Sequence, residues 1–473
     1  MLSRVSRTST FILLLTAFAG AAFGQINEAG FKKLDSYFAD LIAKKRSPAI
    51  SVAVVENGHV VYAKGFGYAN LEQDVEANAS TVYRIGSITK QFTATMIMQL
   101  VKEGKLFIDD TIEKVLPDMP KAWGKVTVKD LLNHTSGIKS YTELKGMMEK
   151  DAMQPTTPLG IIKKVENEPM DFEPGTKWHY NNTGYELLGI ILEKIDKRAF
   201  AESLKERILS PLGMNHTYFV SERSIVRYRA QGYSFGTNGF EHAQYLNMDW
   251  PYAAGSIEST VLDLAKWDEA LYGEKVLPKE LLAKMWEPTV LSDGTIQNYG
   301  FGWGTSKLNG QQLVEHGGGI HGFTTQIRRV PSKGLTVIVL TNTDGPSNPA
   351  LIAKEVMEVM DPTLKVAKLV AEADKNLSAT KEARAVLQSV LDGKFDRSLL
   401  TPEFAKVLTP ELLMEAKTSL NSLGAITKFE FLREAKVNGF TSRIYNVGFA
   451  SIELKLAIAA DSNGKIGGLE IHQ

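Results

Sequence analysis

The sequence predicts a mixed α/β fold of the α+β type, in which helices flank one antiparallel sheet. A second, smaller α+β domain is expected at the C-terminus. Strand-like runs at 49–69 surround Asn57-Gly58, a dipeptide typical of a hairpin turn. A second group of strand-like runs lies far downstream, at 311–342. An alternating apolar and polar run at 428–471 closes the chain. These three observations define the predicted architecture.

The main sheet is expected to form from both ends of residues 45–345. The downstream strands include a tight connection at 331–334, whose Pro-Ser-Lys-Gly sequence is typical of a turn. The sequence between the two groups of strands is mostly helical or loop-like. The economical arrangement is therefore a single sheet with a large helical insertion, a helical subdomain, packed beside it.

The N-terminus is expected to be a secretory signal peptide at residues 1–24. Arg4 and Arg7 precede an apolar stretch at 11–23, and small residues follow up to Gly24. Cleavage is expected before Gln25, which predicts an exported protein, periplasmic or secreted. The alternative is an anchoring helix, but the apolar stretch is short for a membrane span.

The last hundred residues are predicted to form a separate domain. A helix is expected at 349–360, after Asn348 as N-cap, and a further helical stretch at 365–395. Thr401-Pro402 and Thr409-Pro410 are two more helix starts, and Asn438-Gly439 and Asn463-Gly464 mark turns between strands. We therefore expect a main domain at 25–362, which carries the antiparallel sheet, and an α+β domain at 366–473.

Composition excludes several classes of function. The 54 basic and 54 acidic residues cancel, without long runs of one sign, so nothing indicates a nucleic-acid partner. The chain has no cysteine, which excludes disulfides, a thiolate nucleophile and cysteine-ligated metal sites. The pattern His-Glu-x-x-His does not occur, so no metal and no other cofactor is expected.

A serine nucleophile is suggested by the spacing Ser-x-x-Lys, but this spacing alone says little. It occurs four times, so context has to choose among the copies. The sequence after Ser87 is apolar on nearly every face through Val101, which predicts a buried helix. The four copies are Ser87/Lys90, Ser136/Lys139, Ser378/Lys381 and Ser462/Lys465.

Ser87 would then stand at the N-terminus of a buried helix, with Lys90 one turn along on the same side. Free backbone N–H groups at such an end can stabilise an oxyanion. A buried lysine has a lowered pKa, which suits a general base. The alternative is that Ser87 is an ordinary N-cap and Lys90 a surface residue.

Two further groups of residues supply partners for a serine nucleophile. Tyr180 and Asn182 lie in a loop that opens another apolar helix, and they could shuttle a proton and orient a lysine. His316 ends an apparent strand and is followed by three glycines, which let a substrate backbone approach closely. The alternatives are capping chemistry for the first group and a glycine bulge for the second.

Together, Ser-x-x-Lys, Tyr-x-Asn and a strand-borne His-Gly-Gly resemble the serine β-lactamase and penicillin-binding-protein-like superfamily. The closer likeness is to its class C β-lactamase, D-aminopeptidase and esterase branch. The phrases "YRIGSITKQFTA", "LLNHTSGI", "FEPGTKWHYNNTGYELLG" and "HGGGIHGF" agree with it. The likeness covers about residues 30–345 and implies a β-lactamase/transpeptidase-like fold. The last hundred residues resemble small cystatin- or NTF2-type domains.

The resemblance implies a role for each matching residue. Ser87 would be the acylated nucleophile, with Lys90 and Tyr180 sharing the general-base and proton-relay work. Asn182 would orient Lys90 and the substrate, and His316, Gly317 and Gly318 would contribute to substrate binding. The oxyanion hole would use the backbone N–H groups of Ser87 and Gly319.

One departure from the family pattern bears on the substrate. Many β-lactamases carry a lysine where this sequence has His316, and that lysine helps to hold the substrate carboxylate. A histidine is mostly neutral at neutral pH. The sequence therefore favours a peptidase on D-amino-acid peptides or an esterase. The alternatives are a true class C-like β-lactamase, a non-catalytic peptidoglycan or β-lactam sensor, and a C-terminal domain that acts as an adaptor.

An α/β-hydrolase is disfavoured because Ser87 lacks the Gly-x-Ser-x-Gly pattern. The expected partner is a small-molecule or peptide substrate. No apolar segment of the mature chain predicts a membrane span. Substrate choice is expected to depend on loops at 139–170 and 220–255, and the sequence leaves the oligomeric state open.

Overall fold

The computed structural model describes residues 17–148, 150–220, 223–366, 371–421, 423–437, 439–449 and 453–472. The chain divides into two compact units between Lys365 and Val366. Residues 1–16 of the predicted signal peptide lie outside the described residues, and a helix, α1, runs from Ala17 to Ala43. No helix in the described ranges is both long enough and apolar enough to span a membrane.

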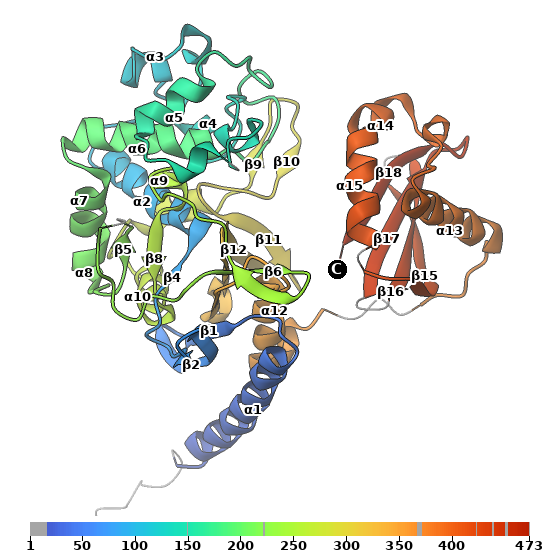
Figure 1. The fold of residues 1–473 in the computed structure, drawn as a ribbon, viewed down its shortest axis with the longest axis horizontal. Coiled ribbons are helices and arrows are strands. Elements are labelled where there is room, and N and C mark those ends of the chain that lie inside the picture. Colours follow the sequence, from blue (N-terminus) through green and yellow to red (C-terminus); the bar gives the residue numbers. More distant parts are fainter. Residues whose placement is uncertain are drawn as a thin grey trace, which may run out of the picture. The chain divides into compact units, whose positions relative to one another are not determined.

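The larger unit is built on a seven-stranded antiparallel sheet in the order β11-β12-β13-β14-β1-β2-β3. Strands β1, β2, β11 and β12 of this sheet are labelled in Figure 1. Strand β1 pairs with β14, so that Ile50 lies opposite Thr341. The prediction that one antiparallel sheet forms from both ends of the segment is therefore confirmed. The strands are β1 (Ala49–Glu56), β2 (His59–Asn70), β3 (Val75–Glu76), β11 (Gly304–Leu308), β12 (Gln311–Ile320), β13 (Phe323–Val330) and β14 (Leu335–Thr341).

The predicted turn at Asn57-Gly58 joins β1 and β2, and both residues have positive φ, as this kind of hairpin requires. Alternate residues of β1 enter two different cores. Ile50, Val52 and Val54 pack with α1 and with α12 (Pro349–Met360). The intervening residues face the helices of the insertion. The sheet is therefore covered by helices on both faces.

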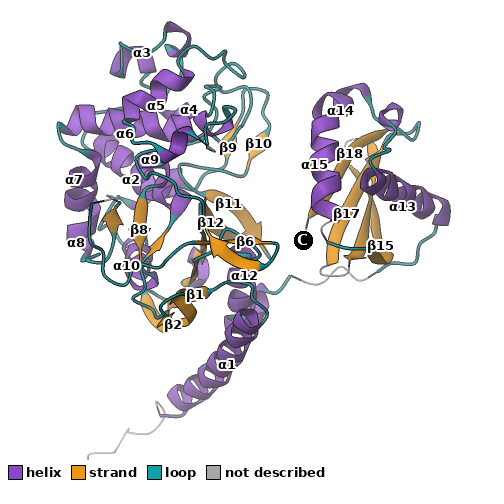
Figure 2. Ribbon diagram, viewed as in Figure 1, coloured by secondary structure: helices purple, strands orange, loops and turns teal. Residues whose placement is uncertain are grey.

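Between β3 and β11 the chain forms the helical insertion, which also carries several short strands (Figure 2). Helices α2 and α6 contact each other, and both contact α9. The helices are α2 (Thr89–Lys102), α3 (Ile112–Val115), α4 (Val128–Leu132), α5 (Pro158–Val165), α6 (Asn182–Asp196), α7 (Phe200–Leu204), α8 (Ser210–Leu212), α9 (Tyr252–Gly255), α10 (Val261–Ala270) and α11 (Lys279–Met285). The short strands are β4 (Tyr83–Arg84), β5 (Tyr218–Phe219), β6 (Tyr233–Gly236), β7 (Gly239–His242), β8 (Ile257–Ser259), β9 (Thr289–Val290) and β10 (Ile296–Gln297).

The smaller unit packs helices against a four-stranded antiparallel sheet in the order β15-β16-β17-β18. Its helices are α13 (Leu377–Asp392), α14 (Pro402–Val407) and α15 (Pro410–Asn421), and its strands are β15 (Ile426–Val437), β16 (Phe440–Phe449), β17 (Glu453–Ala460) and β18 (Ile466–His472). Among the described residues, 365–366 and 371–376 are not helical, so the expectation of a helix there is wrong, and Asn376 caps a helix that begins at Leu377. Residues 367–370 of that prediction lie outside the described residues. Its likeness to cystatin- or NTF2-type domains stays a prediction.

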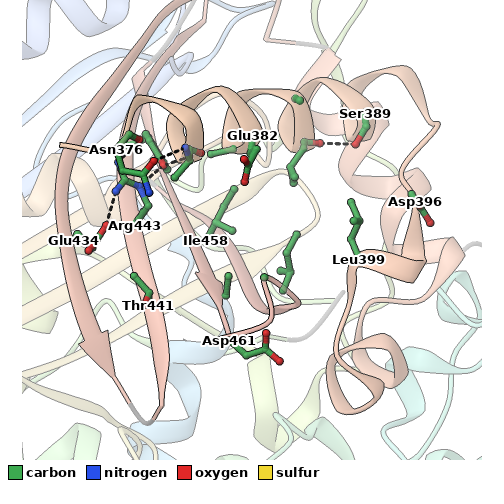
Figure 3. Close-up of a pocket in the computed structure, with 18 of the residues that line it drawn as sticks. Asn376, Glu382, Ser389, Asp396, Leu399, Glu434, Thr441, Arg443, Ile458 and Asp461 are labelled. Atoms are coloured by element: carbon green, nitrogen blue, oxygen red, sulfur yellow. Dashed lines mark hydrogen bonds and ion pairs between the residues drawn. The ribbon is translucent and has the colours of Figure 1, made fainter. Parts of the chain in front are cut away.

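The smaller unit contains a cleft of about 630 Å³ between α13 and the sheet (Figure 3). Small side chains on α13, among them Ala379 and Ala383, leave this space open. Thr441 and Ala460 lie opposite each other in the register of β16 and β17 and line the cleft from the sheet. The charged group most deeply set in its wall is Arg443, which lies on the same strand face as Thr441.

Candidate active site

Ser87 lies in a short 3-10 turn, Gly86–Ile88, that leads directly into α2. Gly86 has a positive φ of 52°, and a Cβ at this position would lie 3.1 Å from the backbone nitrogen of Gly319. A glycine is therefore required before the serine. The Ser87 side chain makes no capping hydrogen bond to the helix. The interpretation of Ser87 as an ordinary N-cap is not supported, and its hydroxyl is available for chemistry.

Lys90 is completely buried, and three oxygen atoms surround its Nζ. Nζ lies 3.2 Å from Oγ of Ser87, 2.8 Å from Oδ1 of Asn182 and 3.0 Å from the carbonyl oxygen of Ala254. Burial lowers the pKa of Lys90 to about 7, although the carboxyl group of Glu186 acts in the opposite direction. Lys90 therefore exists in part as a neutral amine near neutral pH, beside the serine hydroxyl.

Tyr180 covers the other side of the lysine. The Lys90 Nζ lies 4.7 Å from the centre of the Tyr180 ring. Burial raises the pKa of the Tyr180 hydroxyl above its ordinary value, and the adjacent Ser87 partly opposes that rise. Within the described residues this hydroxyl has no hydrogen-bond partner of good geometry. It is therefore a protonated group, close to Ser87, without a fixed structural role.

Asn182 begins α6, and the side chain of the preceding Asn181 caps that helix by accepting a hydrogen bond from Gly184 N. Because Asn181 is the N-cap, the side chain of Asn182 is not needed to cap the helix. Its Oδ1 accepts from Lys90, and its Nδ2 donates to Oγ1 of Thr142. The structure thus brings together Ser87 and Lys90, at the start of α2, and Tyr180 and Asn182, at the start of α6, from two segments far apart in the sequence.

His316 lies within β12, which continues beyond it to Ile320. Its Nδ1 lies 2.6 Å from the carbonyl oxygen of Gly317 and donates to it, while Nε2 accepts from the Tyr299 hydroxyl at 2.8 Å. Burial and the nearby Lys90 lower the His316 pKa to about 4. The ring is therefore neutral at neutral pH, and both its nitrogens already have partners.

The glycines after His316 bring β12 against the nucleophile turn. A Cβ at Gly318 would lie 2.0 Å from the carbonyl oxygen of Ile85, whereas a Cβ at Gly319 would meet nothing within 4 Å. Gly319 itself borders the same cavity as Ser87. The two backbone groups predicted for the oxyanion hole therefore lie at one cavity, and their role stays a prediction.

This cavity has a volume of about 390 Å³. No lysine or arginine side chain borders it among the residues that the structure describes. Both loops expected to set substrate choice contribute to its lining, the first with Tyr141, Thr142 and Met148 and the second with Leu246 and Pro251. His316, Gly317 and Gly318 are not among the described residues that border this cavity, and their contribution to substrate binding stays a prediction.

Two buried ionisable residues near Lys90 were not singled out by the sequence. Glu186 is fully buried one turn after Asn182, and burial raises its pKa well above the ordinary value, although the nearby Lys90 acts in the opposite direction. His134 is buried, accepts a hydrogen bond from Asn181 N at 3.1 Å, and has a pKa well below the ordinary value because of burial. The sequence contained a signal for Glu186, because a residue four positions after Asn182 lies on the same face of the predicted helix.

The other Ser-x-x-Lys copies lack this arrangement. Oγ of Ser136 accepts from the backbone nitrogen of Ile138, and Lys139 forms ion pairs with Glu143 and Asp171. Ser378 donates to Glu382 on the surface of α13. Only Ser87, among the four serines, has a buried lysine beside it, as judged within the described ranges.

One group of exposed side chains, Glu143, Asp171 and His179, has metal-like spacing, with one ligand atom each within 4.8 Å of the others. Lys139 lies 3.0 Å from Glu143 and 3.3 Å from Asp171, so an ammonium group already balances these carboxylates. We therefore interpret these side chains as a surface ion-pair network.

Comparison with known proteins places this geometry in a family. The beta-lactamase family model matches residues 34–359, which is more than half of the chain. The chain therefore belongs to the beta-lactamase family, within the superfamily of serine β-lactamases and penicillin-binding proteins. The resemblance inferred from the motifs is thereby confirmed, as is the predicted fold class.

Among curated proteins, the chain is similar to penicillin-binding protein 4* of Bacillus subtilis, with 30% identity over 66% of this chain and 71% of that protein. Among solved structures it is similar to the octameric penicillin-binding protein homologue of Pyrococcus abyssi, with 27% identity and a TM-score of 0.61, over 94% of this chain and 100% of that one. It is also similar to a D-stereospecific amidohydrolase from Streptomyces sp., with 30% identity and a TM-score of 0.58, over 68% and 95% of the two chains.

Proposed function

We propose that this protein is an exported serine hydrolase that cleaves amide or ester bonds of D-amino-acid derivatives through an acyl-enzyme on Ser87. The observation that carries the proposal is the 3.2 Å separation between Oγ of Ser87 and Nζ of a completely buried Lys90. A serine hydroxyl needs an adjacent base, and a lysine whose pKa is near 7 provides one.

Acylation follows from this arrangement. Neutral Lys90 removes the proton from Ser87 as Oγ forms a bond to the substrate carbonyl carbon, and the carbonyl π electrons move to its oxygen. The backbone N–H groups of Ser87 and Gly319 stabilise that oxyanion. When the tetrahedral intermediate collapses, the bond to the leaving group breaks, and the leaving group takes a proton relayed from Lys90 through Tyr180.

Deacylation repeats the sequence with water. A water molecule loses a proton to the same basic groups as its oxygen attacks the ester carbon of the acyl-enzyme. Collapse of the second intermediate breaks the bond to Oγ, which regains its proton. Asn182 fixes the position of Nζ throughout, because its Oδ1 lies 2.8 Å from that atom.

The charge of the site supports a peptidase, amidase or esterase rather than an antibiotic-hydrolysing enzyme. A β-lactam carries a carboxylate that a fixed cation would hold, but His316 is neutral, with both ring nitrogens already bonded. The similarity to a D-stereospecific amidohydrolase supports the D configuration of the substrate. Export is proposed from the N-terminal sequence pattern alone.

The proposal is tested by a substrate panel with Ser87→Ala as the reference variant. The panel consists of p-nitrophenyl acetate, D- and L-alanine p-nitroanilides and a chromogenic cephalosporin. We expect turnover of the ester and of the D-anilide above the L-anilide and the cephalosporin. Ser87→Ala should lower every rate by about a thousandfold or more. Most of the activity remaining in Ser87→Ala would contradict the mechanism.

A further inference from the structure

The cavity beside Ser87 carries a single carboxylate, that of Asp344, among its described lining residues. Asp344 follows β14 and lies at the exposed rim of the cavity. The lining also includes one imidazole, that of His321, and no side chain with a permanent positive charge. The mechanism derived above uses neither Asp344 nor His321.

The position of Asp344 is fixed from both the backbone and the side chain. Its backbone nitrogen donates to the carbonyl oxygen of Tyr233, which joins the end of β14 to β6. Its Oδ2 accepts from the Ser234 hydroxyl at 3.0 Å and from the backbone nitrogen of Gly322 at 2.7 Å. Gly322 lies in the turn between β12 and β13, next to the strand that carries Gly319. The carboxylate is therefore tied to the same strand pair that is expected to hold the substrate carbonyl.

The two hydrogen bonds both use Oδ2 and leave Oδ1 without a hydrogen bond among the contacts in the described part of the chain. No lysine or arginine borders the described lining to neutralise this oxygen. The other titratable side chain on the rim, His321, uses Nδ1 to donate to the carbonyl oxygen of Gln244 at 3.2 Å. The cavity that Ser87 borders thus has, on its rim, one carboxylate for which the described residues provide no ion-pair partner.

We infer that Asp344 is a substrate-binding residue that selects acyl groups carrying a free ammonium group, so that the preferred substrates are amides or short peptides with an unblocked amino terminus. This inference rests on the proposed function and adds the substrate class to it. An ammonium group on the carbon next to the scissile carbonyl would donate a charge-assisted hydrogen bond to Oδ1 of Asp344. A substrate carboxylate at the same place would be repelled.

The arrangement also explains why His316 does not need to be a cation. A site that recognises an amino group requires a fixed negative charge, and the positive charge of the usual lysine would work against it. His316 is neutral and bonded to Tyr299 and Gly317, so it maintains the strand without adding charge.

The experiment compares two substrates that differ only in this charge. D-alanine p-nitroanilide carries an ammonium group, and N-acetyl-D-alanine p-nitroanilide does not. For the full-length protein we expect kcat/KM to favour the free amine by about tenfold, which is at the lower end for a hydrogen bond to a charged group because Asp344 is exposed. Asp344→Asn should remove most of that preference, and Asp344→Lys should reverse it.

Two controls separate this inference from the function beneath it. Hydrolysis of p-nitrophenyl acetate, which has no amino group, should be unchanged in Asp344→Asn, which shows that the variant folds and retains its chemistry. Asp118→Asn, an exposed acid away from the cavity, should keep the full preference. Equal turnover of the two anilides by the wild-type protein, or an unchanged preference in Asp344→Asn, would overturn the inference alone. Failure to hydrolyse either anilide or the ester would overturn the proposed function and the inference with it.

Discussion

The cavity at Ser87 and the cleft of the smaller unit differ in whether their buried charged groups have ion-pair partners. The cleft is the larger of the two, with about 630 Å³ against about 390 Å³. Its most deeply set charge, Arg443, is matched by ion pairs to Glu434 and Asp374 and donates to the Tyr445 hydroxyl. Arg443 therefore stabilises the fold of that unit.

At Ser87 the buried charge is left without a matching ion. Lys90 forms no salt bridge within the described ranges, and burial lowers its pKa to about 7. Perturbed titratable groups in a cavity, rather than cavity size, distinguish a reactive site. A buried charged group without an ion-pair partner, such as Lys90, therefore marks the reactive site of this protein. A charged group whose partners are all present, such as Arg443, has a structural role.

The largest expected effect on catalysis comes from replacing Lys90, the buried base without an ion-pair partner. Lys90→Met should lower kcat/KM for p-nitrophenyl acetate by about a thousandfold, because Ser87 loses its proton acceptor. In the wild-type protein kcat/KM should rise as the pH passes through about 7, since Lys90 accepts a proton only in its neutral form.

The matched control is Lys381→Met, which changes the lysine of another Ser-x-x-Lys copy, exposed on α13. It should leave both the rate and the pH profile unchanged. A wild-type profile that stays flat across neutral pH would show that Lys90 is not the base.

An intermediate effect is expected from crowding the contact between β12 and the nucleophile turn. Gly318→Ala would place a methyl group 2.0 Å from the carbonyl oxygen of Ile85, so strand or turn must shift. A displacement of about 1 Å at such a site costs about a hundredfold in rate. Gly30→Ala is the control, because its methyl group meets nothing within 4 Å and Gly30 lies in α1, outside the cavity lining. Equal activity of the two variants on p-nitrophenyl acetate would contradict the expected contact.

The smallest effect on activity is expected in the compensated cleft. Arg443→Met removes the cation between Asp374 and Glu434, and should lower the free energy of unfolding of the smaller unit by about 2 kcal/mol. Hydrogen exchange of the β16 amides measures that loss, while kcat/KM for the ester should stay unchanged. A parallel loss of hydrolysis with the larger unit still folded would show that the two regions are functionally coupled.

The sequence predicted the sheet because its signals are local. The Asn57-Gly58 turn and the alternating runs specify strands without knowledge of their partners, and chain order then limits how they can pair. The choice of Ser87 among four serines also rests on a local signal, the apolar helix behind it. Tyr180 and Asn182 were assigned to the same site through the resemblance of the motifs, in their chain order, to a known superfamily.

The remaining features depend on contacts between distant segments. The lowered pKa of His316 follows from its burial and from the nearby Lys90, which lies on α2, far from β12 in the sequence. Asp344 reaches the cavity rim because β6 pairs with the residues after β14. Neither contact follows from spacing or periodicity, since each depends on how separate elements meet in three dimensions.

The central claim, that Ser87 is the acylated nucleophile, is tested most directly by intact mass measurement after treatment with a fluorophosphonate. We expect one covalent adduct on the wild-type protein and on Ser378→Ala, and none on Ser87→Ala. An adduct formed equally well on Ser87→Ala, or no adduct on the wild-type protein, would contradict it.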